Sequence, residues 1–156
     1  MSQQITNPNR AFGYGVDDDP ENAYSIKTPM LNGGSAAIAE GDVVTLTATL
    51  TASVGISCKQ SDASADDDAT VLGVAAEAIA VGDTGNVVVF GYAHVNVGDS
   101  SSITAGQVAT LHATTDGAAA NVTADATSVA GDYLAVFLGA EDLVGTNQAP
   151  VWVRQI

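Results

Sequence analysis

The two histidines of the chain, His94 and His112, are its best candidates for binding a metal or moving a proton. Zinc sites take several Cys or His ligands at short spacings such as H-x-H or H-E-x-x-H. Neither spacing surrounds His94 or His112, and Cys58 is the single cysteine. We therefore expect no zinc site and no disulfide within the chain. Cys58 falls on the apolar side of an alternating run, which predicts a buried and unreactive thiol.

Two runs of three aspartates, at 17–19 and 66–68, could attract calcium. A calcium-binding loop, however, alternates its ligands with other residues and contains a glycine that makes a sharp turn. Three adjacent acidic side chains point in different directions, so solvated surface charge is the favoured interpretation. The sequence therefore predicts no metal ion and no other cofactor.

Two glycine-containing segments have the composition of phosphate-binding or catalytic loops: "GDTGN" at 82–86 and "GDSSS" at 98–102. A dinucleotide-binding loop opens a helix whose N-terminus faces the phosphates, whereas the first segment runs into the strand-like Val87–Val89. The second lacks the glycine that follows the nucleophilic serine of trypsin-like proteases, and His94 lies shortly before it in an expected strand. We interpret both segments as turns. We expect no catalytic residues, and hence a protein that is not an enzyme.

The charge of the chain argues against two classes of partner. Eighteen acidic residues against four basic ones give a formal net charge of −14 at pH 7. Such a field repels the phosphates of nucleic acids and of an anionic membrane surface, so neither is an expected partner. No apolar run approaches the ~20 residues that span a bilayer, and the N-terminus lacks the features of a secretory signal. We therefore expect synthesis in the cytoplasm.

Apolar and polar residues alternate from Val44 to Cys58, with threonine or serine at most of the polar positions. Period-two alternation of this kind predicts a half-buried β-strand. Because strands rarely exceed ~10 residues, we expect a bend near residues 52–55, where Gly55 would kink the strand. The apolar face is expected to be core, and it carries Leu46, Leu50, Val54 and Ile56.

Further strands are expected where β-branched residues lie between turn residues, and no amphipathic helix of three turns is visible. Asp116-Gly117 is a hairpin signal between two strand-like segments. The remaining expected strands cover residues 70–75, 86–97, 133–138 and 150–156. The fold class that follows is all-β: a small β-barrel or β-sandwich domain with an extended N-terminal arm and no helix longer than two turns.

The expected arm covers residues 1–36 and precedes a domain over residues 37–156, because the first segment shows no strand or helix period. Large aromatic side chains are costly to leave in water and are enriched at interface hot spots. We therefore predict that the arm binds a neighbouring protein, and the alternative is a tail folded over its own core. The expected anchors are Phe12, Tyr14 and Tyr24, with Arg10 as the partner of an acidic group.

The chain also contains an internal echo. "IAEGDVVTL" at 38–46 is similar to "ITAGQVATL" at 103–111. Two copies are too few for a solenoid, so the echo predicts two related β-units that share one core, at about residues 38–97 and 103–156. Chance similarity in a chain rich in Ala, Val and Gly is the alternative.

The segment at 69–111, "ATVLGVAAEAIAVGDTGNVVVFGYAHVNVGDSSSITAGQVATL", resembles the core of the capsid decoration (cement, or head-stabilising) proteins of tailed bacteriophages. The shared order is a GVA-like strand end, a short acid-containing segment, a Gly-acid turn, a valine-rich strand, a glycine and an I-x-x-G-x-x-V/A segment. These places are filled here by Val71–Ala76, Glu77, Gly82-Asp83, Val87–Val89, Gly91 and Ile103–Leu111. The resemblance covers somewhat more than a quarter of the chain and does not include the N-terminal arm.

The resemblance implies a β-barrel-like subunit on the outside of a phage head, bound to the major capsid protein and often trimeric. The expected function is therefore that of a structural virion protein, made in the host cytoplasm, which binds the outer surface of an assembled capsid and stabilises it as a homotrimer. The alternative is a carbohydrate-binding or adhesin-type β module on a fibre or surface, in which Tyr92, Tyr133 and Trp152 would line a sugar platform. A small enzyme ranks last.

Overall fold

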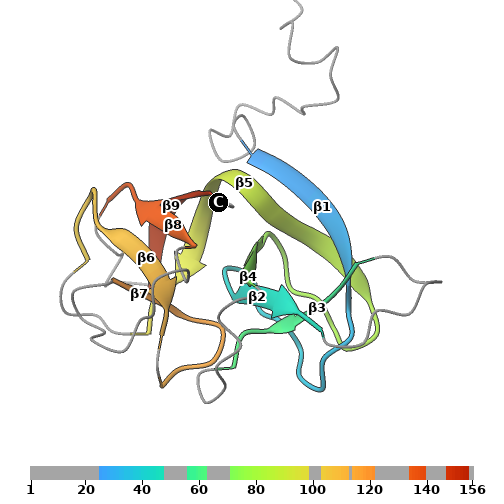
Figure 1. The fold of residues 1–156 in the computed structure, drawn as a ribbon. Helices are drawn as coiled ribbons and strands as arrows, with labels where there is room; N and C mark the ends of the chain where they lie inside the picture. Colours follow the sequence, from blue (N-terminus) through green and yellow to red (C-terminus); the bar gives the residue numbers. More distant parts are fainter. Residues whose placement is uncertain are drawn as a thin grey trace, which may run out of the picture.

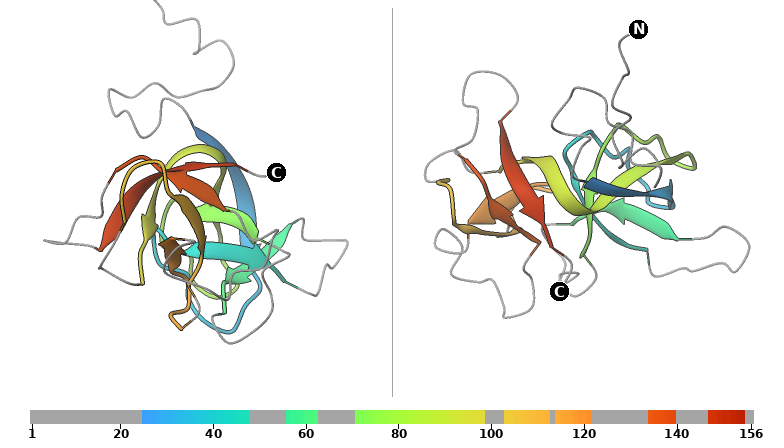
Figure 2. Two further views of the ribbon diagram at one scale, coloured as in Figure 1. Left: turned by 60° about the vertical axis from the view of Figure 1, so that its left-hand side comes forward. Right: turned by 90° about the horizontal axis from the view of Figure 1, so that it is seen from above.

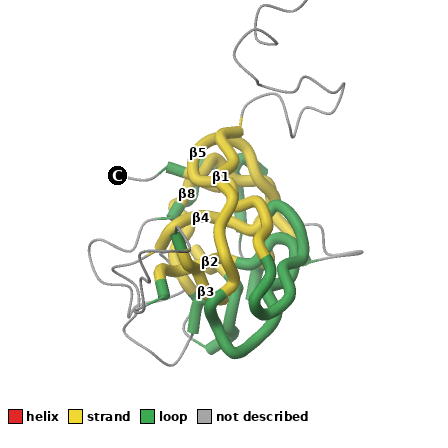
Figure 3. Tube along the Cα trace, turned by 90° about the vertical axis from the view of Figure 1, so that its right-hand side faces the viewer, coloured by secondary structure: helices red, strands yellow, loops and turns green. Residues whose placement is uncertain are grey.

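A computed structural model of the chain describes residues 25–47, 56–62, 71–98, 103–112, 114–121, 134–139 and 147–154. These ranges contain strands and loops and no helix, as Figure 3 shows. None of their elements is therefore a helix that is long and apolar enough to cross a membrane. The nine strands are β1 Ser25–Asn32, β2 Val43–Leu46, β3 Ser57–Gln60, β4 Val71–Ala75, β5 Thr84–Asn96, β6 Val108–Leu111, β7 Ala119–Asn121, β8 Ala135–Phe137 and β9 Gln148–Val153.

The first five strands close into a barrel. Their hydrogen-bonded order is β1-β3-β2-β4-β5, and β5 pairs back onto β1. The β1–β3 pair is parallel, and the other four pairs are antiparallel. Closure leaves no free edge among these strands, which removes the unpaired backbone groups that an open sheet exposes. The all-β prediction, including its barrel alternative, is therefore confirmed.

The remaining strands repeat this order on the other half of β5. The sheet continues as β5-β9-β8-β6-β7, with antiparallel pairs throughout. A parallel bridge between Val97 and Ala119 then links the end of β5 to β7, at the place that the parallel β1–β3 pair holds in the barrel. We call β1–β5 the first unit and β5–β9 the second unit. The long strand β5 belongs to both, and it runs between them in Figures 1 and 2.

Equivalent backbone hydrogen bonds place the two halves of the sequence echo in register. The N–H of Gly41 donates to Ala75 O at 2.9 Å, and the N–H of Gly106 donates to Phe137 O at 2.8 Å. Gly41 and Gly106 have φ angles of 85° and 88°, the left-handed conformation that a type II turn requires at its third residue. The echo therefore corresponds to one turn-and-strand element that the fold uses twice.

The apolar side chains form two clusters. The smaller one fills the barrel of the first unit and includes Met30, Val44 and Val87. The larger one contains the inward side chains of the second unit, such as Phe137, which is fully buried. It also contains Val43, Val74 and Val88, which point out of the first barrel. The second unit therefore packs its core against the outer face of the first.

The alternating run was expected to form one bent strand, and this part of the prediction is wrong. The run overlaps β2 and β3, which pair antiparallel with Leu46 opposite Cys58. Ile56 was expected in the core but is 44% exposed. Because the chain reverses direction between β2 and β3, the face of Ile56 does not follow from the alternation in β2. Of the other expected core positions, Leu46 is partly buried, and residues 50 and 54 lie outside the described residues.

The polar side of this run is buried at Thr45 and Ser57 and partly exposed at Thr47. Thr45 is fully buried, and its Oγ1 has no hydrogen-bond partner among the described residues. Both faces of β2 are covered because Val44 points into the barrel and Val43 points into the larger cluster. Alternation predicts a solvated face only when one side of a sheet is open, so it could not show this.

The expected boundary of the N-terminal arm is also wrong. Residues 25–32, which were placed in the arm, form β1 and pair along β5 from Ser25–Gly91 to Leu31–Thr84. The register shifts between Ile26 and Lys27, where Val89 of β5 is the extra residue. The buried positions of β1 include the polar Ser25 and Asn32 as well as Met30, so β1 shows no alternation of apolar and polar residues in the sequence.

The other expected strands agree with the structure within a few residues. Residues 70–75, 86–97 and 133–138 contain or overlap β4, β5 and β8, and residues 150–156 overlap β9. The Asp116-Gly117 hairpin joins β6 to β7, with Leu111 opposite Ala119. The "GDTGN" segment was expected to be a turn, and this holds only for its first two residues, since Thr84, Gly85 and Asn86 already belong to β5.

Candidate functional site

The most distinctive surface of the described residues is the outer face of the second unit. Val108 pairs with Val136, and Val136 pairs with Trp152, so the three side chains form a row across β6, β8 and β9. Each of the three is partly exposed. We call these three residues the outer row. Tyr92, opposite Trp152 on β5 and also partly exposed, extends the row by one strand.

Large apolar side chains lie beside the outer row. Phe90 is 45% exposed and packs edge to face against Trp152, with ring centroids 5.8 Å apart. Leu138, two residues after Val136 and hence on the same side of β8, is 46% exposed. Phe90 on β5 and Leu138 just after β8 therefore add exposed aromatic and aliphatic side chains to this face.

The first unit contains the equivalent row, and there it is buried. Val43 pairs with Val74, and Val74 pairs with Val88, across β2, β4 and β5. These three residues, which we call the inner row, are between 0% and 3% exposed because the second unit covers them. The second unit therefore buries this row of the first unit, whereas the equivalent row of the second unit is partly exposed to solvent.

The sequence-based candidates on this face are partly brought together. Tyr92 and Trp152, two of the three proposed platform residues, are register partners, and Tyr133 lies outside the described residues. His94 shares a partly exposed face of β5 with Tyr92 and Asn96. Tyr92 Oη and His94 Nε2 are hydrogen-bonded at 2.9 Å.

The four arm candidates, Arg10, Phe12, Tyr14 and Tyr24, lie outside the described residues. Their role in binding a neighbour stays a prediction. The two aspartate runs at 17–19 and 66–68 lie outside the described residues as well.

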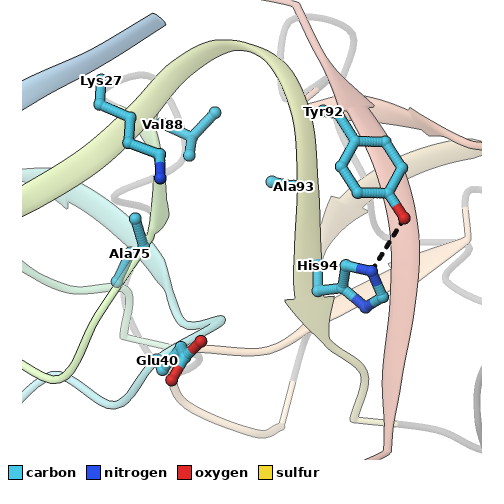
Figure 4. Close-up of a pocket in the computed structure, with 8 residues that line it drawn as sticks. Lys27, Glu40, Ala75, Val88, Tyr92, Ala93 and His94 are labelled. Carbon is cyan, nitrogen blue, oxygen red and sulfur yellow. Dashed lines mark hydrogen bonds between the residues drawn. The ribbon is translucent and has the colours of Figure 1, made fainter. Parts of the chain in front are cut away.

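A small hollow lies between β1, β4 and β5, lined by residues that include Lys27, Glu40, Tyr92 and His94 (Figure 4). Its volume is about 60 Å³. Pockets that bind small organic ligands usually measure roughly 300–1,000 Å³. The hollow has room for a few water molecules and does not match the size of a substrate site.

A partly buried polar network around Asp42, at the junction of the two units, was not found from the sequence. Asp42 is 4% exposed, and its Oδ2 accepts hydrogen bonds from the Ala39 N–H and from Gln60 Nε2, each at 2.8 Å. Its Oδ1 accepts from Asn96 Nδ2 at 2.8 Å, and Gln148 Nε2 donates to Asn96 Oδ1 at 2.9 Å. These hydrogen bonds connect the turn before β2 to β3, β5 and β9. The network therefore stabilises the packing of the two units against each other. The only sign of it in the sequence is the Gly41-Asp42 pair, which is typical of a turn.

The remaining candidates hold structural positions. Cys58 is fully buried, and burial raises the pKa of its thiol, which disfavours the reactive thiolate. Glu77 Oε1 accepts hydrogen bonds from the N–H and the Nδ2 of Asn86 at 2.7 and 3.0 Å. This carboxylate therefore stabilises the first residues of β5. Within the described ranges, no three His, Cys, Asp or Glu side chains are grouped as metal ligands would be.

Comparison with known proteins gives a match of fold and no family. No protein-family model matches the chain, and no curated protein matches it. Among solved structures, a chain of "The capsid of Myoviridae Phage XM1" matches with a TM-score of 0.52 and 20% sequence identity. The match covers 90% of this chain and 87% of that chain. At this identity it shows that the two chains share a fold over most of their length.

Proposed function

We propose that this protein is a structural component of a phage virion that binds the outer surface of an assembled capsid and stabilises it. The observation that carries the proposal is the fold match to a chain of a phage capsid structure, which extends over 90% of this chain. The resemblance of residues 69–111 to capsid decoration proteins supports the same function from the sequence. In this proposal the partner is the major capsid protein, the protein is made in the host cytoplasm, and it acts without catalysis.

Two properties of the described molecule suit this role. Its most distinctive surface is an apolar and aromatic face that includes Phe90 and Trp152. Faces of this composition bind other proteins, since aromatic side chains dominate interface hot spots. The net charge of −14 keeps a crowded exterior soluble and repels free nucleic acid.

Stabilisation would follow from mass action. A protein that binds only the intact shell lowers the free energy of that shell. The effect is about 2.7 kcal/mol per site when the free concentration of the protein is about a hundred times the dissociation constant. Because a shell presents many equivalent sites, modest binding at each site adds up over the particle. A trimer would engage several shell subunits at once and gain avidity without further contacts.

The test is to strip the protein from phage heads, add it back, and follow DNA release on heating. Re-decorated heads should open at a higher temperature than stripped heads. Equal opening temperatures would contradict the proposal. A chain that lacks residues 1–24 keeps every described strand, so it tests separately whether the N-terminal segment takes part in binding. If it binds heads as tightly as the full chain, the arm does not contribute to capsid binding.

A carbohydrate-binding function is the second candidate, and the register pair of Tyr92 and Trp152 favours it. Sugars stack on aromatic rings that are held side by side on a sheet surface. Binding of the isolated protein to a glycan array, lost in Trp152→Ala, would favour this function. Co-purification with intact heads and no glycan binding would favour the capsid function.

A further inference from the structure

We propose that the outer row is a self-association surface, and that its partner is a second copy of this chain. The row consists of Val108, Val136 and Trp152, extended by Tyr92. The proposal goes beyond capsid binding, because it concerns contacts between copies and is measured on the isolated protein.

The first argument comes from the repeat within the molecule. The inner row of Val43, Val74 and Val88 occupies the same positions of the pairing pattern. There the row is covered by a β-unit of this same chain and is buried to 0–3% exposure. The molecule therefore shows what a row at this position packs against. The outer row presents an apolar surface of the same kind, and no described unit of the chain covers it.

The second argument comes from the side chains that differ between the rows. Val88 is replaced by Trp152 at the equivalent position, and Lys27, which pairs with Val88, is replaced by Tyr92. Since the first unit forms the same strand pairs with valine and lysine, the fold does not require aromatic residues there. Trp and Tyr are the residues most enriched at protein–protein hot spots, so their presence on the open row indicates a binding role.

The third argument concerns the neighbouring surface. Phe90, packed against Trp152, and Leu138 enlarge the open row, and Ile26, paired with Phe90, adds an exposed side chain on β1. These are three of the five large apolar side chains that are exposed in the described residues. Phe90, Leu138 and Ile26 lie beside the outer row or pair with one another instead of being scattered, which indicates a protein partner.

Charge sets the conditions under which the contact forms. Each copy carries a formal charge of −14, so two copies repel each other at low salt. At 0.1 M salt the screening length is about 10 Å, and it shortens further as salt is added. Self-association through an apolar face should therefore tighten between low and moderate salt, which is the opposite of an association held by ion pairs.

The test is the mass of the full-length protein by light scattering and sedimentation, with the double variant Tyr92→Lys/Trp152→Val. These substitutions install the residues that the first unit carries at the equivalent positions, so the strands retain side chains already compatible with this pairing. Tyr92→Lys also makes the chain less negative, so weaker association cannot come from added repulsion. We expect an oligomer for the wild type and a dissociation constant at least about tenfold higher for the variant.

The matched control is Val81→Thr, because Val81 is 54% exposed in the turn before β5 and lies off the outer row. It should leave the dissociation constant unchanged. A monomeric wild type at all salt concentrations would overturn the proposal, as would a double variant that associates as the wild type does. A wild type that associates only after residues 1–24 are removed would also overturn it, and would assign the row to the chain's own N-terminal segment. A monomer whose double variant no longer binds heads would assign the row to the capsid protein.

Discussion

Replacing Gly41 or Gly106 by alanine tests both the repeat and the polar network at the junction of the two units. The glycines occupy equivalent turns, with φ angles of 85° and 88°. An alanine in the left-handed conformation costs about 1–2 kcal/mol, so this part of the cost should be the same at both sites. At Gly106 an added Cβ meets no atom within 4 Å, and Gly106→Ala should therefore destabilise the protein by about 1–2 kcal/mol.

At Gly41 the same Cβ would lie 2.5 Å from Gln148 Nε2 and 2.8 Å from Asn96 Oδ1. Both side chains must move, which disrupts the Gln148–Asn96 hydrogen bond and the bond from Asn96 to buried Asp42. Leaving a buried polar group without its partner costs about 1–3 kcal/mol. Gly41→Ala should therefore destabilise the protein by about 2–5 kcal/mol in total, and by more than Gly106→Ala.

Urea denaturation of the two variants, followed by circular dichroism, measures both costs. Gln148→Ala should remove part of the difference, because Gly41→Ala then meets a shorter side chain. The two substitutions should therefore be non-additive, with a coupling of about 0.5–3 kcal/mol. Equal destabilisation by Gly41→Ala and Gly106→Ala would refute the assignment of the network to the unit junction.

Three further predictions follow from burial and strand pairing. A chain without residues 1–24 should show a cooperative urea transition, whereas one without residues 1–32 should not, because it lacks β1 and the barrel stays open. Val74→Ala should cost about 2–3 kcal/mol and Val136→Ala less than half of that in monomer unfolding, since Val74 is fully buried and its equivalent Val136 is partly exposed. The Cys58 thiol should react with Ellman's reagent far more slowly in the folded chain than in urea, and stability should fall as pH rises through the pKa of the unfolded thiol, because the folded state holds that proton more tightly.

The sequence by itself determined the local elements and the class of fold. Residues 86–97 and the Asp116-Gly117 hairpin were found from β-branched runs and turn residues, which act within a few residues of the chain. The echo between 38–46 and 103–111 pointed to a repeated element, because a turn that needs a glycine at φ near +85° imposes the same sequence wherever it occurs. The net charge gave the expectation that nucleic acid and an anionic membrane surface are not partners. Charge can be counted from the sequence because it depends on no contact between distant residues.

Tertiary structure alone decided which of these elements close a barrel and which faces are covered. β1 was assigned to the arm because its buried positions include the polar Ser25 and Asn32, and only its pairing with β5 shows that it belongs to the barrel. Val74 and Val136 stand at equivalent positions of two similar strands, yet one is buried and the other is partly exposed. That difference depends on what packs above each strand, and neither residue's neighbours in sequence carry this information. The outer row can therefore be recognised only by comparing the two units in the folded structure. The inner row is covered by the second unit, whereas the equivalent outer row is partly exposed.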